Sequence, residues 1–264
     1  MSFNNNDLKI ILDLLPNEKR QMLYIVINSY EDIPSIKHET IYNTVLNEII
    51  HDISINNPET IFNKYKEYFK IYELKIVSQG VVERIGEKNI LFRARKGNEI
   101  ARVRDNLTGE EFYANLPFSD ENIKAPKPGN NNGSRFNYCG CSYMYLSDTI
   151  ETCLLEVQAE KEQNVSVGQF KPKCQLKLLN INKFSSVRLD LWKDILLKSI
   201  LTGEEHYYNV CRFLNKILFS TFNCVGIIYE SSFSNGNNYV IYDVSKIELI
   251  ENSKKIYKIK SIII

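Results

Sequence analysis

The spacing of apolar residues changes near Gly86–Asn89, and this change limits the fold more than any other feature of the chain. Residues 1–85 carry apolar side chains at helical spacing. One such stripe consists of Leu8, Ile11, Leu12 and Leu15. From residue 86 onward, short alternating or continuously apolar segments lie between turns, a pattern typical of strands. The sequence therefore predicts an α+β fold, with a helical N-terminal region at 1–85 and a mixed, short-stranded domain at 86–264.

Short strands are expected at several places in this second region. The predicted strands are 90–95, 165–170, 174–179, 225–229 and 239–242, with edge strands in the tail from 246. A helical stretch, interrupted near Gly203, is predicted from 189 to 222. Residues 105–133 are polar and rich in proline, glycine and asparagine, so we expect a long irregular loop there. Loops of that length inside a compact domain tend to be functional.

The composition excludes several classes of protein. Hydrophobic and charged contents of 44% and 25% are those of a soluble globular protein, and a net charge of +1 predicts no nucleic-acid-binding or membrane-binding face. No window approaches the ~18 apolar residues of a membrane span, and the first residues do not resemble a secretory signal. Six scattered cysteines fit free thiols, which predicts a cytoplasmic protein. The pair Cys139 and Cys141 has no second ligand pair, so no metal site is predicted.

Three residues suited to ligand binding lie within Gly133–Glu156. Arg135 is in a Gly/Asn-rich loop, and Tyr145 is in a short apolar run. Glu156 lies on the flank of the apolar face of a predicted helix. We expect these three side chains to converge on one cleft. Each also has an ordinary explanation, because most glutamates lie on the surface and many tyrosines lie in the core.

The start of that helix is predicted from the sequence Ser147-Asp148-Thr149-Ile150-Glu151. In this pattern Asp148 caps the free backbone amides, and Glu151 reaches back to the start of the helix.

Two arginines lie on one face of the predicted strand 90–95. Arg93 and Arg95 are two residues apart, so their side chains point to the same side. A solvated face is the usual meaning of such a pattern. The functional alternative is that an arginine enters a cleft, where its planar guanidinium group can bind two phosphate oxygens at once.

These residues occur in a recognisable order. The segments are Phe92-Arg93, Gly133-Ser134-Arg135-Phe136-Asn137, Tyr143-Met144-Tyr145-Leu146-Ser147, Glu156, Gly226-Ile227-Ile228-Tyr229-Glu230-Ser231 and Asn235-Gly236-Asn237-Asn238-Tyr239-Val240. This order resembles the RES domain family, which is named after an arginine, a glutamate and a serine. The resemblance covers roughly Leu91 to Val244.

The resemblance implies a fold related to ADP-ribosyltransferases and a bacterial toxin that consumes NAD as its substrate, without a further cofactor. Such toxins break the nicotinamide–ribose bond with water or phosphate, and a cognate antitoxin with a helix-turn-helix domain blocks the site. By position, the implied residues are Glu156, Tyr145 and Arg93 for catalysis, and Arg135, Ser231, Asn238 and Arg95 for binding NAD.

The residue types suit that chemistry. Nicotinamide is a cationic leaving group in NAD, so no general acid is needed to expel it. A carboxylate such as Glu156 can stabilise the oxocarbenium-like ribose and accept a hydrogen bond from a ribose hydroxyl. Arginines offset the pyrophosphate charge, and Tyr145 offers a flat face to the pyridinium ring.

Two other functions are weighed against this one. The chain could transfer ADP-ribose to a macromolecule, or it could be a catalytically inactive interaction module whose helical N-terminus does the binding. Residues 1–85 contain no candidate catalytic group, and we expect them to cover or extend the catalytic part. Neither direct nucleic-acid binding nor membrane binding is expected, and oligomerisation is left open.

Overall fold

The computed structural model describes the chain in ranges separated by gaps. The described residues are 13–21, 44, 47–49, 51–52, 60, 63–65, 80–129, 132–183, 211–212, 215–216 and 223–260. The chain divides into two units. One unit contains Met1–Val81, Ser134–Phe136 and Lys183–Asn223, and the other contains Val82–Gly133, Asn137–Asn182 and Cys224–Ile264.

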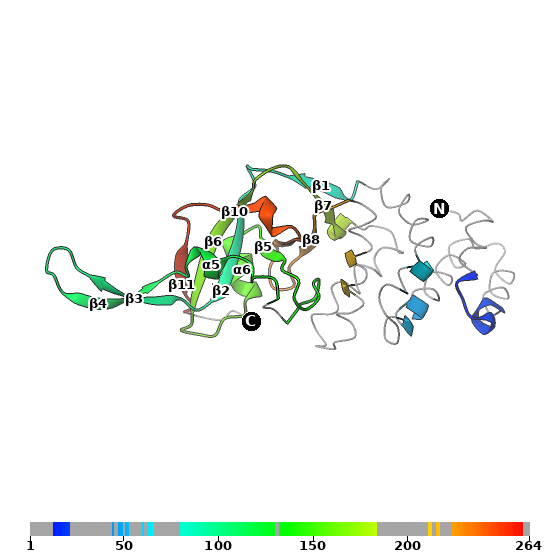
Figure 1. Cartoon of the computed structure of the whole chain (residues 1–264), viewed down its shortest axis with the longest axis horizontal. Coiled ribbons are helices and arrows are strands. Elements are labelled where there is room, and N and C mark those ends of the chain that lie inside the picture. The colour runs from blue at the N-terminus through cyan, green and yellow to red at the C-terminus, as the bar shows by residue number, and fades with distance from the viewer. Residues whose placement is uncertain are drawn as a thin grey trace. The chain divides into compact units, whose positions relative to one another are not determined.

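Most of the second unit is one mixed sheet, drawn in Figure 1. Among the described residues its nine strands are β1 (Val82–Ile85), β2 (Leu91–Lys96), β5 (Met144–Ser147), β6 (Asn164–Pro172), β7 (Leu176–Asn180), β8 (Gly226–Glu230), β9 (Asn237–Ile241), β10 (Ile247–Leu249) and β11 (Lys255–Lys258). Their order is β1-β7-β8-β9-β5-β2-β6-β10, with β11 also paired to β6. Within this described sheet β7 and β8 pair parallel, whereas the other neighbours pair antiparallel. The fold is therefore α+β with mostly strands, which confirms the predicted fold class.

The predicted strands of the second region are confirmed to within a few residues. The segments 90–95, 165–170, 174–179, 225–229 and 239–242 correspond to β2, β6, β7, β8 and β9. The tail supplies β10 and β11, both of which pair with β6. Short 3-10 turns, Ile181–Lys183 and Val244–Lys246, follow β7 and precede β10.

The prediction of a structureless segment at 105–133 was wrong in part. β3 (Glu99–Arg104) and β4 (Glu111–Leu116) form a separate two-stranded sheet, and α5 (Asp120–Ile123) is a single helical turn. Two contacts fix the base of this hairpin. The Glu99 carboxylate accepts hydrogen bonds from Ser119 N and Asn122 Nδ2, at 2.8 and 2.9 Å. These bonds lower the pKa of Glu99 to about 2, and the bond from the Ser119 backbone has the largest effect.

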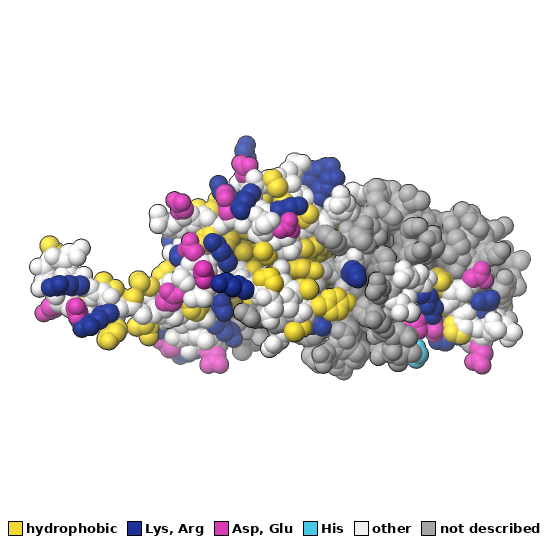
Figure 2. All heavy atoms as spheres, in the orientation of Figure 1, with side chains coloured by type: hydrophobic (Ala, Val, Ile, Leu, Met, Phe, Trp, Pro, Cys, Tyr) yellow, Lys and Arg dark blue, Asp and Glu magenta, His cyan; other side chains and the backbone are white. Residues whose placement is uncertain are grey.

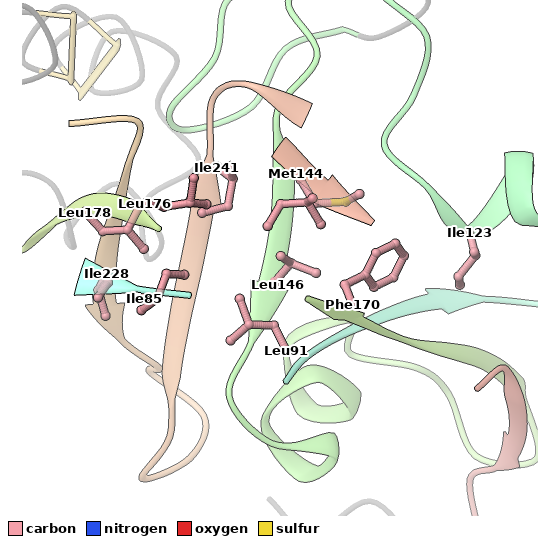
Figure 3. Close-up of a cluster of buried hydrophobic side chains, with 11 residues drawn as sticks. Ile85, Leu91, Ile123, Met144, Leu146, Phe170, Leu176, Leu178, Ile228 and Ile241 are labelled. Atoms are coloured by element: carbon pink, nitrogen blue, oxygen red, sulfur yellow. The ribbon is translucent and has the colours of Figure 1, made fainter. Parts of the chain in front are cut away.

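One apolar cluster fills the side of the sheet shown in Figure 3. Its buried members are Ile85, Leu91, Ile123, Met144, Leu146, Phe170, Leu176, Leu178, Ile228, Ile241 and Ile247. Successive strand residues point to opposite faces, so Met144 and Leu146 of β5 enter this cluster. Tyr145 and Ser147 of the same strand therefore face the other side.

A second cluster covers that other side of the sheet. Helix α6 (Ile150–Glu156) contributes Cys153 to it, and β6 contributes Val165 and Val167. Phe92 and Ala94 of β2 pack against the same cluster. Tyr145, Ser147 and Glu156, considered below, lie where α6 meets this face, whereas the Arg93 guanidinium contacts Ile123 O of the first cluster.

The first unit is described only in short pieces. Residues 17–21, 47–49, 51–52, 63–65, 211–212 and 215–216 are helical. The buried Tyr65 hydroxyl donates to Asp52 at 2.6 Å. The prediction of a helical region up to residue 85 was wrong at its end, because Val82–Ile85 is strand β1 and pairs with β7. Most of the predicted N-terminal helices, and most of the predicted helix 189–222, lie outside the described residues, so these stay predictions. No described helix is both long and apolar enough to cross a membrane.

Candidate active site

A cavity of about 310 Å³ lies between α6 and the strands β2, β5, β8 and β9. It is lined by Phe92, Arg93, Ala94, Tyr145, Leu146, Ser147, Cys153, Glu156, Val157, Tyr229 and Asn238. Its volume is at the lower end of the range of small-molecule sites. Three residues predicted for catalysis, Arg93, Tyr145 and Glu156, therefore border one cavity, together with Asn238.

Glu156 ends α6 and is partly buried. Its Oε1 atom accepts two hydrogen bonds, from Ser231 Oγ at 2.7 Å and from Asn238 Nδ2 at 2.6 Å. Both donors come from the β8–β9 hairpin: Ser231 directly follows β8, and Asn238 lies in β9. Oε2 accepts no hydrogen bond from the described residues. One carboxylate oxygen is thus anchored, and the other is available to a ligand.

The start of α6 differs from the prediction by one residue. Thr149 is the cap, since its Oγ1 accepts a hydrogen bond from Thr152 N at 3.0 Å. Asp148 instead accepts hydrogen bonds from the backbone and side-chain nitrogens of Asn237, at 3.0 and 2.9 Å. The local sequence pattern wrongly predicted Asp148 as the cap, because its carboxylate instead accepts hydrogen bonds from Asn237, which is distant in the sequence. The interaction ties the start of β9 to the end of β5.

Arg93 lies at the edge of the cavity with its guanidinium held by backbone. Nε donates to Ile123 O at 2.9 Å, and Nη1 donates to Tyr145 O at 3.1 Å. Burial, and next the nearby charge of Arg95, lower the pKa of Arg93 to about 10, while Tyr145 opposes this shift. Arg93 therefore stays cationic at neutral pH. Two of its five N–H groups serve these carbonyls, which leaves donors for a ligand.

The Tyr145 side chain combines a ring that lines the cavity with a hydroxyl fixed by the protein. The hydroxyl donates to Asn137 Oδ1 at 2.7 Å. Asn137 is buried, and its amide nitrogen donates to Cys141 O at 2.8 Å. The loop that contains Asn137 therefore sets the orientation of the tyrosine.

The two other arginines predicted from the sequence are placed differently. Arg95 is exposed, donates to Asn122 O and lies 5.5 Å from the Phe118 ring centroid. Arg135 belongs to the first unit, where its guanidinium lies 5.7 Å from the ring centroid of Phe136. Their proposed role in binding NAD stays a prediction.

Two polar residues of the site were not predicted from the sequence. Ser147 Oγ donates to Asn238 Oδ1 at 2.8 Å, and Asn137 holds the Tyr145 hydroxyl as described above. A signal for Ser147 was present: it lies two residues after Tyr145 in a strand and so shares its face. Asn137 lies in an irregular loop, where no periodic pattern marks it.

Cysteine and histidine give no metal centre in the described part of the chain, where no group of three or more suitable ligands was found. Cys139 and Cys141 are exposed.

The fold and the cavity define a class of protein, an α+β domain whose mixed sheet and one helix enclose a small-molecule-sized site with a carboxylate, an arginine and a tyrosine. Residues 100–258, more than half of the chain, match the family model of the RES domain. The chain belongs to the RES domain family. Tyr145, Glu156, Ser231 and Asn238 lie within the matched range, whereas Arg93 precedes it.

Comparison with solved structures gives one likeness to report. A crystal structure of the M. tuberculosis MbcT–MbcA toxin–antitoxin complex contains a chain that is 14% identical, with a TM-score of 0.39. The likeness covers 71% of this chain and 91% of that chain. No curated protein matches the sequence.

Proposed function

We propose that this chain is an NAD-consuming toxin that cleaves the nicotinamide–ribose bond of NAD. The observation that carries the proposal is the position and hydrogen bonding of the Glu156 carboxylate. Its carboxylate borders a cavity, Oε1 is anchored by Ser231 and Asn238, and Oε2 is left for a ligand. Membership of the RES domain family supports the same activity.

The proposed reaction needs one fixed negative charge. The bond between ribose C1′ and the pyridinium nitrogen breaks, its electron pair goes to the nitrogen, and neutral nicotinamide leaves. Positive charge develops on the ribose, where a preorganised Glu156 carboxylate stabilises it. The oxygen of water or phosphate then bonds to C1′, and an attacking water loses a proton to solvent. Stabilisation that acts mainly in the transition state raises turnover rather than affinity.

Tyr145 and Arg93 are proposed to bind and orient NAD. The Tyr145 ring offers a face to the cationic pyridinium, and Arg93 keeps N–H groups for the phosphates. A cavity of about 310 Å³ suits the nicotinamide and its ribose, with the rest of NAD extending outward. Arg95 is a proposed contact for that remainder, and binding of NAD by Arg135 stays a proposal from the sequence alone.

The family also suggests control by another protein. We propose that a cognate antitoxin, in this family one with a helix-turn-helix domain, blocks the site until it is removed. The same chemistry with a protein or nucleic-acid side group in place of water would make the chain an ADP-ribosyltransferase, and this alternative is distinguished by the products.

The direct test is to incubate the purified chain with NAD and identify the products by mass, with and without phosphate. We expect nicotinamide together with ADP-ribose, or with phosphorylated ADP-ribose when phosphate is the acceptor. Glu156→Gln keeps the shape but removes the charge, so its kcat should fall ~10²-fold or more. Its Kd for NAD should stay within about tenfold of the wild type, because the pyridinium charge exists before the bond breaks.

Glu151→Gln is the matched control. Glu151 is an exposed glutamate in the first turn of the same helix, so its loss should leave turnover unchanged. Near-normal turnover of Glu156→Gln would remove Glu156 from catalysis. Absence of nicotinamide release by the wild type would refute the proposed function.

A further inference from the structure

We infer that Ser147 is a positioning residue for Glu156, and that it acts through the side-chain amide of Asn238. The inference rests on the proposed function for its kinetic consequence, and on the hydrogen bonds for its geometry. It assigns Asn238 to holding the catalytic carboxylate rather than to contacting NAD.

Three side chains form a chain of hydrogen bonds. Ser147 Oγ donates to Asn238 Oδ1 at 2.8 Å, and Asn238 Nδ2 donates to Glu156 Oε1 at 2.6 Å. Ser147 and Asn238 are 3% and 5% exposed, so water cannot readily replace these partners.

The strand register builds this arrangement into the sheet. Ser147 of β5 and Asn238 of β9 are direct partners in the antiparallel pairing. Side chains of such partners lie on the same face, with Cβ atoms about 5 Å apart. Because α6 packs on that face, Glu156 at its end meets the amide of Asn238.

The Asn238 amide can couple the Ser147 hydroxyl to the Glu156 carboxylate because its two ends differ in hydrogen-bonding character. Nδ2 is a donor and suits a carboxylate, whereas Oδ1 is an acceptor and would repel one. A hydroxyl on Oδ1 satisfies the acceptor while Nδ2 remains on Glu156. Without that hydroxyl, Oδ1 is left buried and unsatisfied, which favours rotation of the amide away from the carboxylate.

The consequence concerns which oxygen of Glu156 meets the ligand. Ser231 and Asn238 both donate to Oε1, so the two hydrogen bonds together restrict rotation of the carboxylate, and Oε2 accepts no hydrogen bond from the described residues. If Asn238 turns away, Ser231 alone remains, and the carboxylate can rotate. A loosened carboxylate stabilises the transition state less well, whereas NAD in its ground state loses little.

A double-mutant cycle tests the inference in the full-length chain. We expect Ser147→Ala to lower kcat about tenfold, with KM changed less than about threefold, and Asn238→Ala to lower kcat at least as much. In the Asn238→Ala background, Ser147→Ala should have no further effect on kcat. An equal loss in both backgrounds, or no loss in either, would overturn the inference.

Two further variants separate positioning from plain loss of packing. Ser147→Cys fills nearly the same volume with a much weaker donor, so it should reproduce the loss of kcat even if Ser147→Ala folds poorly. Ser166→Ala is the matched control, because Ser166 is also a fully buried strand serine, and its hydroxyl donates to Gly97 O at 2.8 Å. It should keep wild-type kcat. A loss of kcat in Ser166→Ala equal to that in Ser147→Ala would count against a specific role.

A readout without NAD keeps this inference separate from the proposed function. The two side-chain amide protons of Asn238 can be followed by NMR, and the one on the carboxylate should have a distinct shift. Ser147→Ala should move both resonances, and Ser166→Ala should leave them in place. Unmoved resonances in Ser147→Ala would overturn the inference even if NAD is cleaved, and moved resonances support it even if NAD is not the substrate.

Discussion

Single residues at the site combine a structural role with a proposed binding or catalytic role, and Tyr145 is the clearest case. Its ring borders the cavity, while its hydroxyl is bonded to the buried Asn137. Substitution can separate these jobs because phenylalanine keeps the ring and removes only the hydroxyl. The same separation is not possible for Glu156, since the atoms that anchor it and the atoms proposed to act belong to one carboxylate.

We predict that Tyr145→Phe keeps most of the affinity for NAD and lowers the free energy of unfolding by about 1 kcal/mol, the usual net worth of one hydrogen bond. Tyr145→Ala should lose affinity about tenfold, because it removes the face offered to the pyridinium. Calorimetric titration in a Glu156→Gln background measures binding without turnover. Tyr113→Ala, at an exposed tyrosine of β4, is the control and should bind normally. Equal loss in the Phe and Ala variants would show that the hydroxyl, not the ring, binds NAD.

At the scale of elements, the β8–β9 hairpin carries both donors that hold Glu156, Ser231 in the turn and Asn238 in β9. The turn also contacts the helix. It approaches α6 closely at Gly236, where an added Cβ atom would overlap Thr152 Oγ1 and lie 2.7 Å from Asp148 Oδ1. The turn is also bonded to the helix, since the hydroxyls of Ser234 and Thr152 are 2.9 Å apart. The absence of a side chain at Gly236 thus lets the turn rest against α6.

Gly236→Ala should therefore destabilise the protein by about 1–3 kcal/mol, as overpacking generally does. It should also lower turnover, because displacement of the turn moves Ser231 and Asn238 away from Glu156. Thermal unfolding and nicotinamide release measure the two effects. The control is Gly86→Ala, since no atom lies within 4 Å of a Cβ there, and this variant should match the wild type. An equally stable and active Gly236→Ala variant would contradict the proposed role of this contact.

The sequence predicted most of the elements that bury one or both faces, although β1, which buries Ile85, lies in the segment 1–85 that was predicted to be helical. β2, β6, β7, β8 and β9 contribute to the apolar clusters, so their residues show the alternation or apolar runs of strands. The β3–β4 hairpin was missed because it buries little: Ile100 and Tyr113 are 71% and 76% exposed. Without a buried face, hydrophobic periodicity does not mark a strand. α5 was missed because four residues are too few for a helical pattern.

At the scale of the whole molecule, the sequence could suggest the site residues but not the bonds between them. The order of motifs brought forward Glu156, Ser231 and Asn238. Their contacts join positions 75 and 82 residues apart, through a sheet order that no local pattern contains. For the same reason the long-range partner of Asp148 was missed. On the face shown in Figure 2, acidic and basic side chains are interspersed over the described residues, in agreement with the low net charge.

The last prediction concerns the whole protein in a cell. If the chain consumes NAD, its production in a bacterial host that lacks the antitoxin should stop growth and lower the NAD pool. Glu156→Gln should be harmless at equal abundance, because it keeps the fold but loses the charge that stabilises the transition state. Glu151→Gln should be as toxic as the wild type, since its side chain is exposed and lies at the other end of α6. Growth rate, NAD content and protein level are measured together. Growth arrest with a constant NAD pool and ADP-ribose attached to a macromolecule would favour the transferase alternative. A harmless wild type with unchanged NAD would contradict the toxin proposal.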